Sequence, residues 1–175
     1  MISPIPPTEA VRLAVLHAVD ILDTPPDRRF DALVELAARI CQKPMADLSL
    51  VDQDRQWFKA RLGITEQETP RDISFCQHTI MGERPTIVQD AIYDPRFSDS
   101  PLVRQQGIRF YAGAPVNVMG ENVGALCVLD TYPGDLTAGQ VHALRVLAEL
   151  ASWLIHESFA ERNSCEDETP FPEGA

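Results

Sequence analysis

Cys76 and His78 are the residues whose types most directly suggest chemistry, because both lie in the short segment DISFCQHTI. A thiol at the start of a helix is easier to ionise, and an ionised thiol is a nucleophile. Residues two positions apart on a helix do not face each other, however, so His78 is poorly placed to activate Cys76. We expect Cys76 to be a small buried residue that packs on a sheet, and we keep a reactive thiol as the alternative.

Three carboxylates, Asp90, Asp94 and Asp130, could indicate paired acid–base catalysis. Asp90 and Asp94 lie in a segment beside Pro95, where Asp is common as a turn residue. Asp130 ends a strand, where its carboxylate can cap the next turn. The turn roles are therefore the favoured interpretation.

Motifs for metal or phosphate binding are absent from the sequence. It has no HExxH, no CxxC and no Gly-rich phosphate loop, and its four cysteines are scattered. We therefore expect no metal site and no catalysis by the chain itself.

The overall charge limits the classes of partner. The 175 residues carry a formal net charge of -11, which argues against nucleic acid and against anionic membrane surfaces. No apolar run is long enough to span a membrane, and the N-terminus lacks the pattern of a signal peptide. We expect a cytoplasmic protein with free thiols, no nucleic-acid partner and no membrane partner.

The element best placed to position these residues is a hairpin within Arg109–Asp130. Its strands are expected at Phe110–Val118 and Asn122–Asp130, and Gly120 allows the tight turn between them. The second strand is apolar on both faces, so both faces of the sheet must be covered.

The remaining elements follow from apolar periodicity and capping residues. Thr8 and Asp27 are the expected caps of the first two helices, and Thr137 with Gln140 forms a capping box for the last one. The expected helices are Glu9 to Leu22, Arg28 to Gln42, Phe75 to Met81, Leu102 to Gln106 and Leu136 to about Phe159; the further expected strands are Ala46–Val51, Gln56–Arg61 and Thr86–Gln89. Residues 1–8 form a lead-in, residues 9–160 one domain, and residues 161–175 a disordered acidic tail.

Long helices at both ends and a mainly antiparallel sheet between them make an α+β sandwich. The apolar arc of the first helix is wider than one core contact needs, and Trp153 lies beside the apolar stripe of the last helix. Both features suggest that the terminal helices have a helical partner.

The order and spacing of six segments resemble the GAF domain family of small-molecule sensor domains. The segments are ILDTPPDRRFDALVELA, DISFCQHTI, IVQDAIYDPRF, IRFYAGAPV, VGALCVLD and LTAGQVHALRVLAELA. The similarity covers Glu9 to Glu157 and is to the type found before diguanylate cyclase or histidine kinase modules in bacteria. From the sequence we expect no output domain after this one.

The resemblance implies a PAS-like antiparallel sheet with the N- and C-terminal helices on one face, often forming a dimeric bundle. It implies a ligand pocket on the other face, closed by loops and short helices. The residues expected there are Phe75, Cys76, His78, Asp90, Tyr93, Asp94, Phe97, Tyr111, Cys127 and Asp130.

Three known activities of this family are not expected from the motifs. The region SPLVRQQGIRFYAG holds neither the Cys of bilin-binding members nor the catalytic Cys of free-methionine sulfoxide reductases. The Asn-Lys…Phe…Asp-Glu pattern of cyclic-nucleotide-binding members is also missing.

The sequence therefore predicts a non-catalytic sensory domain that binds an unidentified small molecule or senses redox state. It would act as a homodimer through its terminal helices and signal in trans to a histidine kinase or diguanylate cyclase. One alternative is a thiol-dependent enzyme, such as a sulfoxide reductase, that uses Cys76 either alone or together with Cys127. The other is a protein-interaction module whose pocket is filled by its own side chains.

Overall fold

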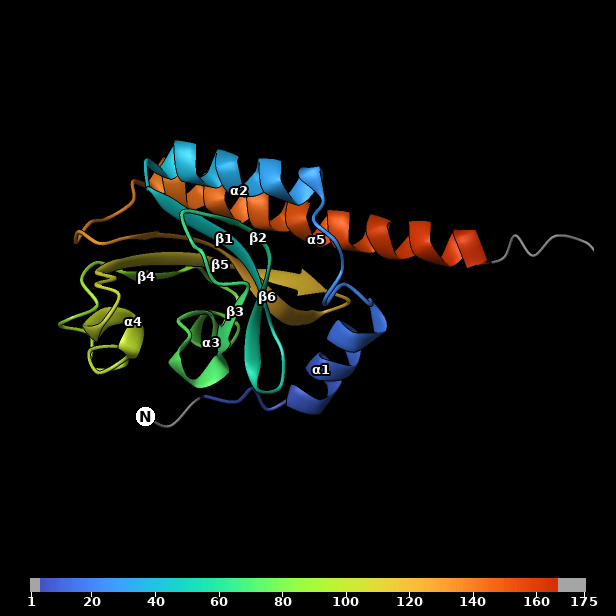
Figure 1. The fold of residues 1–175 in the computed structure, drawn as a ribbon, viewed down its shortest axis with the longest axis horizontal. Helices are drawn as coiled ribbons and strands as arrows, with labels where there is room; N and C mark the ends of the chain where they lie inside the picture. The colour runs from blue at the N-terminus through green and yellow to red at the C-terminus, as the bar shows by residue number, and fades with distance from the viewer. Residues whose placement is uncertain (1–3, 167–175) are drawn as a thin grey trace, which may run out of the picture.

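The computed structural model describes residues 4–166, with side chains to residue 162, and shows the expected α+β sandwich (Figure 1). Within these residues one six-stranded sheet has the strand order β3-β2-β1-β6-β5-β4. All of its pairings are antiparallel. The strands are β1 Met45–Val51, β2 Arg55–Leu62, β3 Glu68–Pro70, β4 Thr86–Val88, β5 Phe110–Val118 and β6 Glu121–Asp130.

The central hairpin of β5 and β6 forms as predicted. Its two-residue turn places Met119 at φ 50° and Gly120 at φ 87°. A turn with two positive φ angles matches the right-handed twist of the flanking strands. The side chain of Asn117 supports the turn by accepting a hydrogen bond from the Gly120 amide at 3.1 Å.

Helices α2 (Arg28–Cys41) and α5 (Ala138–Glu166) lie side by side over one face of the sheet (Figure 1). Their predicted caps are confirmed. The Asp27 carboxylate accepts the Arg29 amide at 2.9 Å. Thr137 and Gln140 make both bonds of the capping box, at 2.9 and 3.3 Å. Apolar residues from both helices and from one face of the sheet form the larger core, which includes Cys41.

The first helix differs from the prediction. Helix α1 covers only Glu9–Ala18, and Thr8 makes no side-chain cap but donates a hydrogen bond to Glu121. After α1 the chain turns at Asp20, so that Val19 and Ile21 enter the core. The helix packs chiefly on β6, apart from the layer of α2 and α5 (Figure 1). The wide apolar arc therefore reflects this turn into the core, and it no longer argues for a dimer through α1.

The other face of the sheet is covered by short elements: η1 (Arg71–Ile73), α3 (Cys76–Thr79) and α4 (Pro101–Arg104). A second core lies beneath them. Trp57 packs into the helix-side core, whereas Phe58 faces this second side. Strand β3 is not among the expected strands, because three edge residues that end in a proline give no periodic signal.

Helix α5 is longer than predicted and continues to Glu166. The guanidinium of Arg162 donates to the Val19 carbonyl at 2.6 Å, and Arg29 pairs with Glu161 at 3.1 Å, so this end of the helix is fixed to the domain. The predicted tail thus begins with helix, and its residues 167–175 lie outside the described part. None of the described helices combines the length and apolarity that a membrane crossing requires.

Candidate functional site

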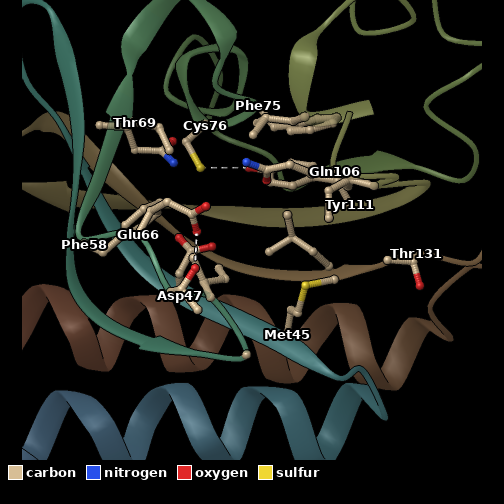
Figure 2. A pocket seen from close by; sticks show the side chains of 17 residues that line it. Met45, Asp47, Phe58, Glu66, Thr69, Phe75, Cys76, Gln106, Tyr111 and Thr131 are labelled. Atoms are coloured by element: carbon tan, nitrogen blue, oxygen red, sulfur yellow. Dashed lines mark hydrogen bonds between the residues drawn. The ribbon is translucent and has the colours of Figure 1, made fainter. Parts of the chain in front are cut away.

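A cavity of about 140 Å³ lies between the sheet and the segments that cover its second face (Figure 2). Strand β1 contributes Asp47, and β5 contributes Tyr111. Phe75 and Cys76 enter from α3 and the residue before it. The residues that line the cavity are Met45, Asp47, Gln56, Phe58, Gly63, Ile64, Thr65, Glu66, Thr69, Phe75, Cys76, Leu102, Gln106, Ile108, Tyr111, Leu129 and Thr131.

The walls of the cavity are largely apolar, and exposed Thr65, Glu66 and Gln106 lie at its mouth. Three polar atoms inside are buried without a hydrogen-bond partner: Asp47 Oδ1, Gln56 Oε1 and Thr69 Oγ1. Burying a polar atom unpaired costs free energy, and native proteins normally supply a partner. These atoms therefore mark where a bound group would make its polar contacts.

Two thiols meet beside the cavity. Cys76 Sγ and Cys127 Sγ are 3.2 Å apart, and Ser49 donates its hydroxyl to Cys76 at 3.1 Å. The Tyr111 hydroxyl is 3.3 Å from Cys127 Sγ and 3.5 Å from Cys76 Sγ. Figure 2 shows Tyr111 beside Cys76. Thr79 fixes that hydroxyl from the other side at 2.7 Å.

Gly113 makes room for this arrangement. A Cβ at this position would collide with the Tyr111 hydroxyl and lie 3.1 Å from Cys127 Sγ. Gly113 is the register partner of Cys127 on the β5–β6 ladder, so the Tyr111 side chain reaches the thiols only because position 113 has no side chain.

The acidic groups of the site influence one another. Burial raises the pKa of Asp47 well above its ordinary value, and the neighbouring Cys76 adds to this effect. Burial also raises the pKa of Cys127 and of Tyr111. At Cys76 burial acts in the same direction, but hydrogen bonds from Cys127, Ser49 and Tyr111 outweigh it and lower the pKa. Cys76 is therefore the thiol that ionises first.

Half of the predicted site residues gather here. Phe75, Cys76 and Tyr111 line the cavity, and Cys127 lies against Cys76. Phe97 packs behind Phe75 with ring centroids 4.4 Å apart. His78 contacts Phe97 edge-on, away from both thiols, as its spacing from Cys76 indicates. Burial, together with the charge of Arg96, lowers the pKa of His78.

Asp90, Tyr93 and Asp94 were predicted in the pocket and lie outside it, along an open depression of the surface. Asp90 accepts from Arg109 at 2.6 Å and Asp94 pairs with Arg96 at 2.6 Å, so both carboxylates are used in local ion pairs. Both also accept a backbone amide two residues on, which confirms their turn role.

Asp130 is also outside the cavity. It has the strand parity of Leu126 and Val128, which face the helices, whereas Cys127 has the opposite parity. Its carboxylate lies 3.5 Å from Lys43 Nζ and accepts the Tyr132 amide at 3.1 Å, so it caps the turn after β6.

The main residue that sequence reasoning missed is Asp47. It alternates with Ala46 and Leu48, which enter the helix-side core, so a carboxylate had to point into the second layer. That buried acid within the strand MADLSLV was the available signal. Gln56 and Thr69 gave no comparable signal, because polar residues near strand ends are common.

The arrangement can bind a small molecule, since the cavity offers apolar walls and unpaired polar atoms. It can also exchange two thiols for a disulfide. A metal ion has candidate ligands in Asp47, Cys76 and Cys127, whose ligand atoms all lie within 4.8 Å of one another.

The described residues define a six-stranded antiparallel sheet with two long helices on one face, and with short elements and a cavity on the other. The family model described as GAF domain matches residues 25–155. The chain belongs to the GAF domain family, as the six sequence segments suggested.

A curated relative is a cyclic di-GMP phosphodiesterase of Pseudomonas aeruginosa, 40% identical over 156 residues. The match covers 87% of this chain but only 27% of that protein, so the chain spans about a quarter of its length. This relative is a signalling protein that is named as an enzyme. The expectation that the chain is not an enzyme is therefore wrong as stated.

Solved structures share the fold at low identity. The GAF domain of a phosphoenolpyruvate-protein phosphotransferase from Coxiella burnetii has a TM-score of 0.67 at 15% identity, over 87% of this chain and 96% of that one. The PixJ GAF domain of Thermosynechococcus elongatus has a TM-score of 0.64 at 14% identity. The match covers 91% of this chain and 98% of that one. A type II free methionine-R-sulfoxide reductase from Thermoplasma acidophilum has a TM-score of 0.63 at 14% identity. The match covers 75% of this chain and 93% of that one.

Proposed function

We propose that this chain is a sensory GAF domain that binds a small molecule in the cavity beside Tyr111 and Cys76. The observation that supports this most is the set of buried atoms without partners at Asp47, Gln56 and Thr69. A domain whose cavity was merely a packing defect would be lined by apolar atoms and would need no partners there.

The shape and charge of the cavity narrow the ligand. A volume of about 140 Å³ is below the roughly 300–1,000 Å³ of pockets for drug-sized ligands, so the ligand is small. None of the residues that line the cavity is Lys, Arg or His, whereas Asp47 and Glu66 are acids. Such a site favours a neutral or cationic molecule with N–H or O–H donors over a carboxylate or phosphate.

The proposed signalling role follows from the relative that is named a cyclic di-GMP phosphodiesterase. We propose that ligand binding is passed through α2 and α5 to a module that makes, degrades or responds to cyclic di-GMP, or to a histidine kinase. The cavity is too small for a cyclic dinucleotide, so the sensed molecule differs from the second messenger.

A dimer through the outer surface of α2 and α5 would give the signal a route. Large apolar side chains remain exposed on this surface at spacings of three or four residues: Leu36 and Ile40 on α2, and Val146, Leu150 and Trp153 on α5. This replaces α1 as the proposed contact. Continuous helical packing between two copies would connect the two cavities to a shared bundle.

The ligand proposal is tested by thermal unfolding with a panel of small amides, amines and nucleobases, each beside a carboxylate of similar size. At a hundredfold excess over Kd, a ligand should raise the midpoint by about 5–10 °C. The variant Ile108→Trp fills the cavity and should lose this response. Val11→Trp, at an exposed position of α1 outside both the cavity and the proposed dimer surface, should keep it. A panel without any response, or an equal response of Ile108→Trp, would reject the proposal.

A thiol-dependent reductase is the second candidate, and it is favoured by the 3.2 Å between Cys76 and Cys127. In such a reaction a sulfoxide oxygen leaves as water while the two thiols become a disulfide. With dithiothreitol as the reductant, free methionine sulfoxide should then be turned over by the wild type and not by Cys76→Ser. Absence of turnover in the wild type eliminates this candidate.

A further inference from the structure

A buried cluster of one carboxyl and two thiol groups adjoins the cavity. Its three residues come from three separate elements. Asp47 on β1 is the register partner of Cys127 on β6, so both side chains lie on the same face of the sheet. Cys76 reaches the pair from the first residue of α3. The ligand atoms of all three residues lie within 4.8 Å of one another, and all three residues are buried.

Among the residues whose side chains the structure describes, none supplies a cation to this cluster. Asp47 is 2% exposed, and its Oδ1 has no hydrogen-bond partner. Arg61, which lies opposite Asp47 on β2, donates instead to Gln67 at 2.6 Å. No Lys, Arg or His is among the residues that line the adjoining cavity. A buried carboxylate that is ionised needs a counter-charge or a metal ion, and a bound cation would supply that charge at Asp47.

We propose that Asp47, Cys76 and Cys127 bind one divalent metal ion of the zinc class. Two thiolates select such a borderline-soft ion over magnesium or calcium, which prefer oxygen ligands. Three protein ligands leave a fourth tetrahedral position, and an exogenous ligand could reach it from the cavity that Asp47 and Cys76 line.

The geometry needs only a small adjustment. Two zinc–sulfur bonds of about 2.3 Å at the tetrahedral angle separate the sulfurs by roughly 3.8 Å. The sulfurs are 3.2 Å apart, so they would have to separate by about half an ångström. The hydroxyls of Ser49 and Tyr111 already approach the sulfurs and would then donate to the bound thiolates, as outer-shell groups of metal sites do.

The site could not be read from the sequence, because its ligands are 29 and 51 residues apart and none forms a spaced motif. It also does not depend on the sensory role. A small molecule can occupy the apolar part of the cavity with or without the metal, and it is detected by its own mass and its own thermal shift.

The test uses the reduced chain, freed of metal and kept without oxygen, and titrates it with Co²⁺ and with Zn²⁺ against a chromophoric chelator. We expect one equivalent of metal and, with Co²⁺, the near-ultraviolet charge-transfer band of cobalt–thiolate bonds. Cys76→Ser, Cys127→Ser and Asp47→Asn should each weaken binding by about 100-fold or more. Cys41→Ala removes a buried thiol from the opposite core and should bind as the wild type does.

Several results would overturn the inference. One is a wild type that shows no cobalt–thiolate band, and this result needs no variant to fold. Another is equal binding by wild type, Cys76→Ser and Cys127→Ser variants whose circular dichroism shows that they are folded, since the metal would then be adventitious. A third is a Cys76–Cys127 disulfide in the isolated protein whose reduced form takes up no metal, which would make the pair a redox couple.

Discussion

Asp47 and Cys127 face each other across the ladder of β1 and β6, so a carboxylate and a thiol lie side by side in the centre of the sheet. The neighbouring strand β5 carries Gly113 at the same level. Both side chains of the pair lie on the face that helices α2 and α5 leave free. Strand register thus determines which face of the sheet carries the cavity, and the loops only cover it.

Gly113→Ala should disrupt this region. The new Cβ would overlap the Tyr111 hydroxyl, so the ring must leave its place beside the two thiols. We expect a loss of about 2–3 kcal/mol in the free energy of unfolding, measured in urea, because the tightly packed layer cannot expand. Gly82→Ala is the matched control, since a Cβ there would meet no atom within 4 Å. Equal stability of both variants would show that Tyr111 does not depend on Gly113.

Glu9 should make the domain acid-sensitive. Although burial alone would raise its pKa, hydrogen bonds from Arg12 and Arg71 lower the pKa from 4.5 to about 2. A carboxyl whose pKa is depressed by folding stabilises the protein above its unfolded pKa, and this contribution is lost as the pH falls from about 4.5 to 2. Glu9→Gln should therefore cost about 1–2 kcal/mol at pH 7, after allowance for solvent screening.

The pH profile distinguishes this ion-pair effect from a packing effect. The difference in unfolding free energy between the wild type and Glu9→Gln should shrink steadily between pH 4.5 and pH 2. Glu35→Gln, at an exposed position of α2, should follow the wild type throughout. A difference that stays constant with pH would mean that the charge of Glu9 is not what stabilises the domain.

The fold was predictable because its longest elements carry strong periodic signals. The hairpin Phe110–Asp130 and the caps at Asp27 and Thr137 were each recovered to within a residue or two. Helix α1 was not, because Val19 and Ile21 continue its apolar spacing although the chain has already turned. Periodicity reports which residues are buried, but not which element buries them.

Phe97→Ala should loosen one wall of the site. Phe97 is buried behind Phe75, which stacks in turn on Tyr111 with ring centroids 4.9 Å apart. Removing the ring leaves a void in this second core and should cost about 3–4 kcal/mol in the free energy of unfolding. Tyr132→Ala, at an exposed ring, should cost little. A cost below 1 kcal/mol for Phe97→Ala would show that the wall does not depend on this stack.

The site itself was only half predictable. Phe75, Cys76 and Tyr111 line the cavity and Cys127 adjoins it, as expected from the conspicuous residue types in two short segments. That they bind a ligand stays a prediction. Asp90 and Asp94 were misplaced, because a loop rich in carboxylates looks the same whether it faces a cavity or forms its own ion pairs with Arg109 and Arg96. Asp47 was overlooked, since strand register alone brings it beside Cys127.

Trp153→Glu should separate the proposed dimer without unfolding the domain. The Trp153 ring is 57% exposed on α5, so replacing it by Glu should change the free energy of unfolding of one chain little. In the proposed dimer the Glu would place an unpaired charge in the helical interface. Light scattering at tens of micromolar should show a dimer for the wild type and a monomer for the variant. Tyr93→Glu, 81% exposed on the opposite layer, should remain dimeric. A monomeric wild type would remove the dimer from the account.

The most direct test of the account is native mass spectrometry of the freshly purified chain beside the same sample denatured. The account predicts an excess mass in the native spectrum that disappears on denaturation, with a small-molecule component that Ile108→Trp fails to retain. Its size would identify the class of ligand, and a metal would appear separately as a fixed increment. A native mass equal to the bare polypeptide, together with an unresponsive thermal panel, would contradict a ligand-binding cavity and favour a protein-interaction module.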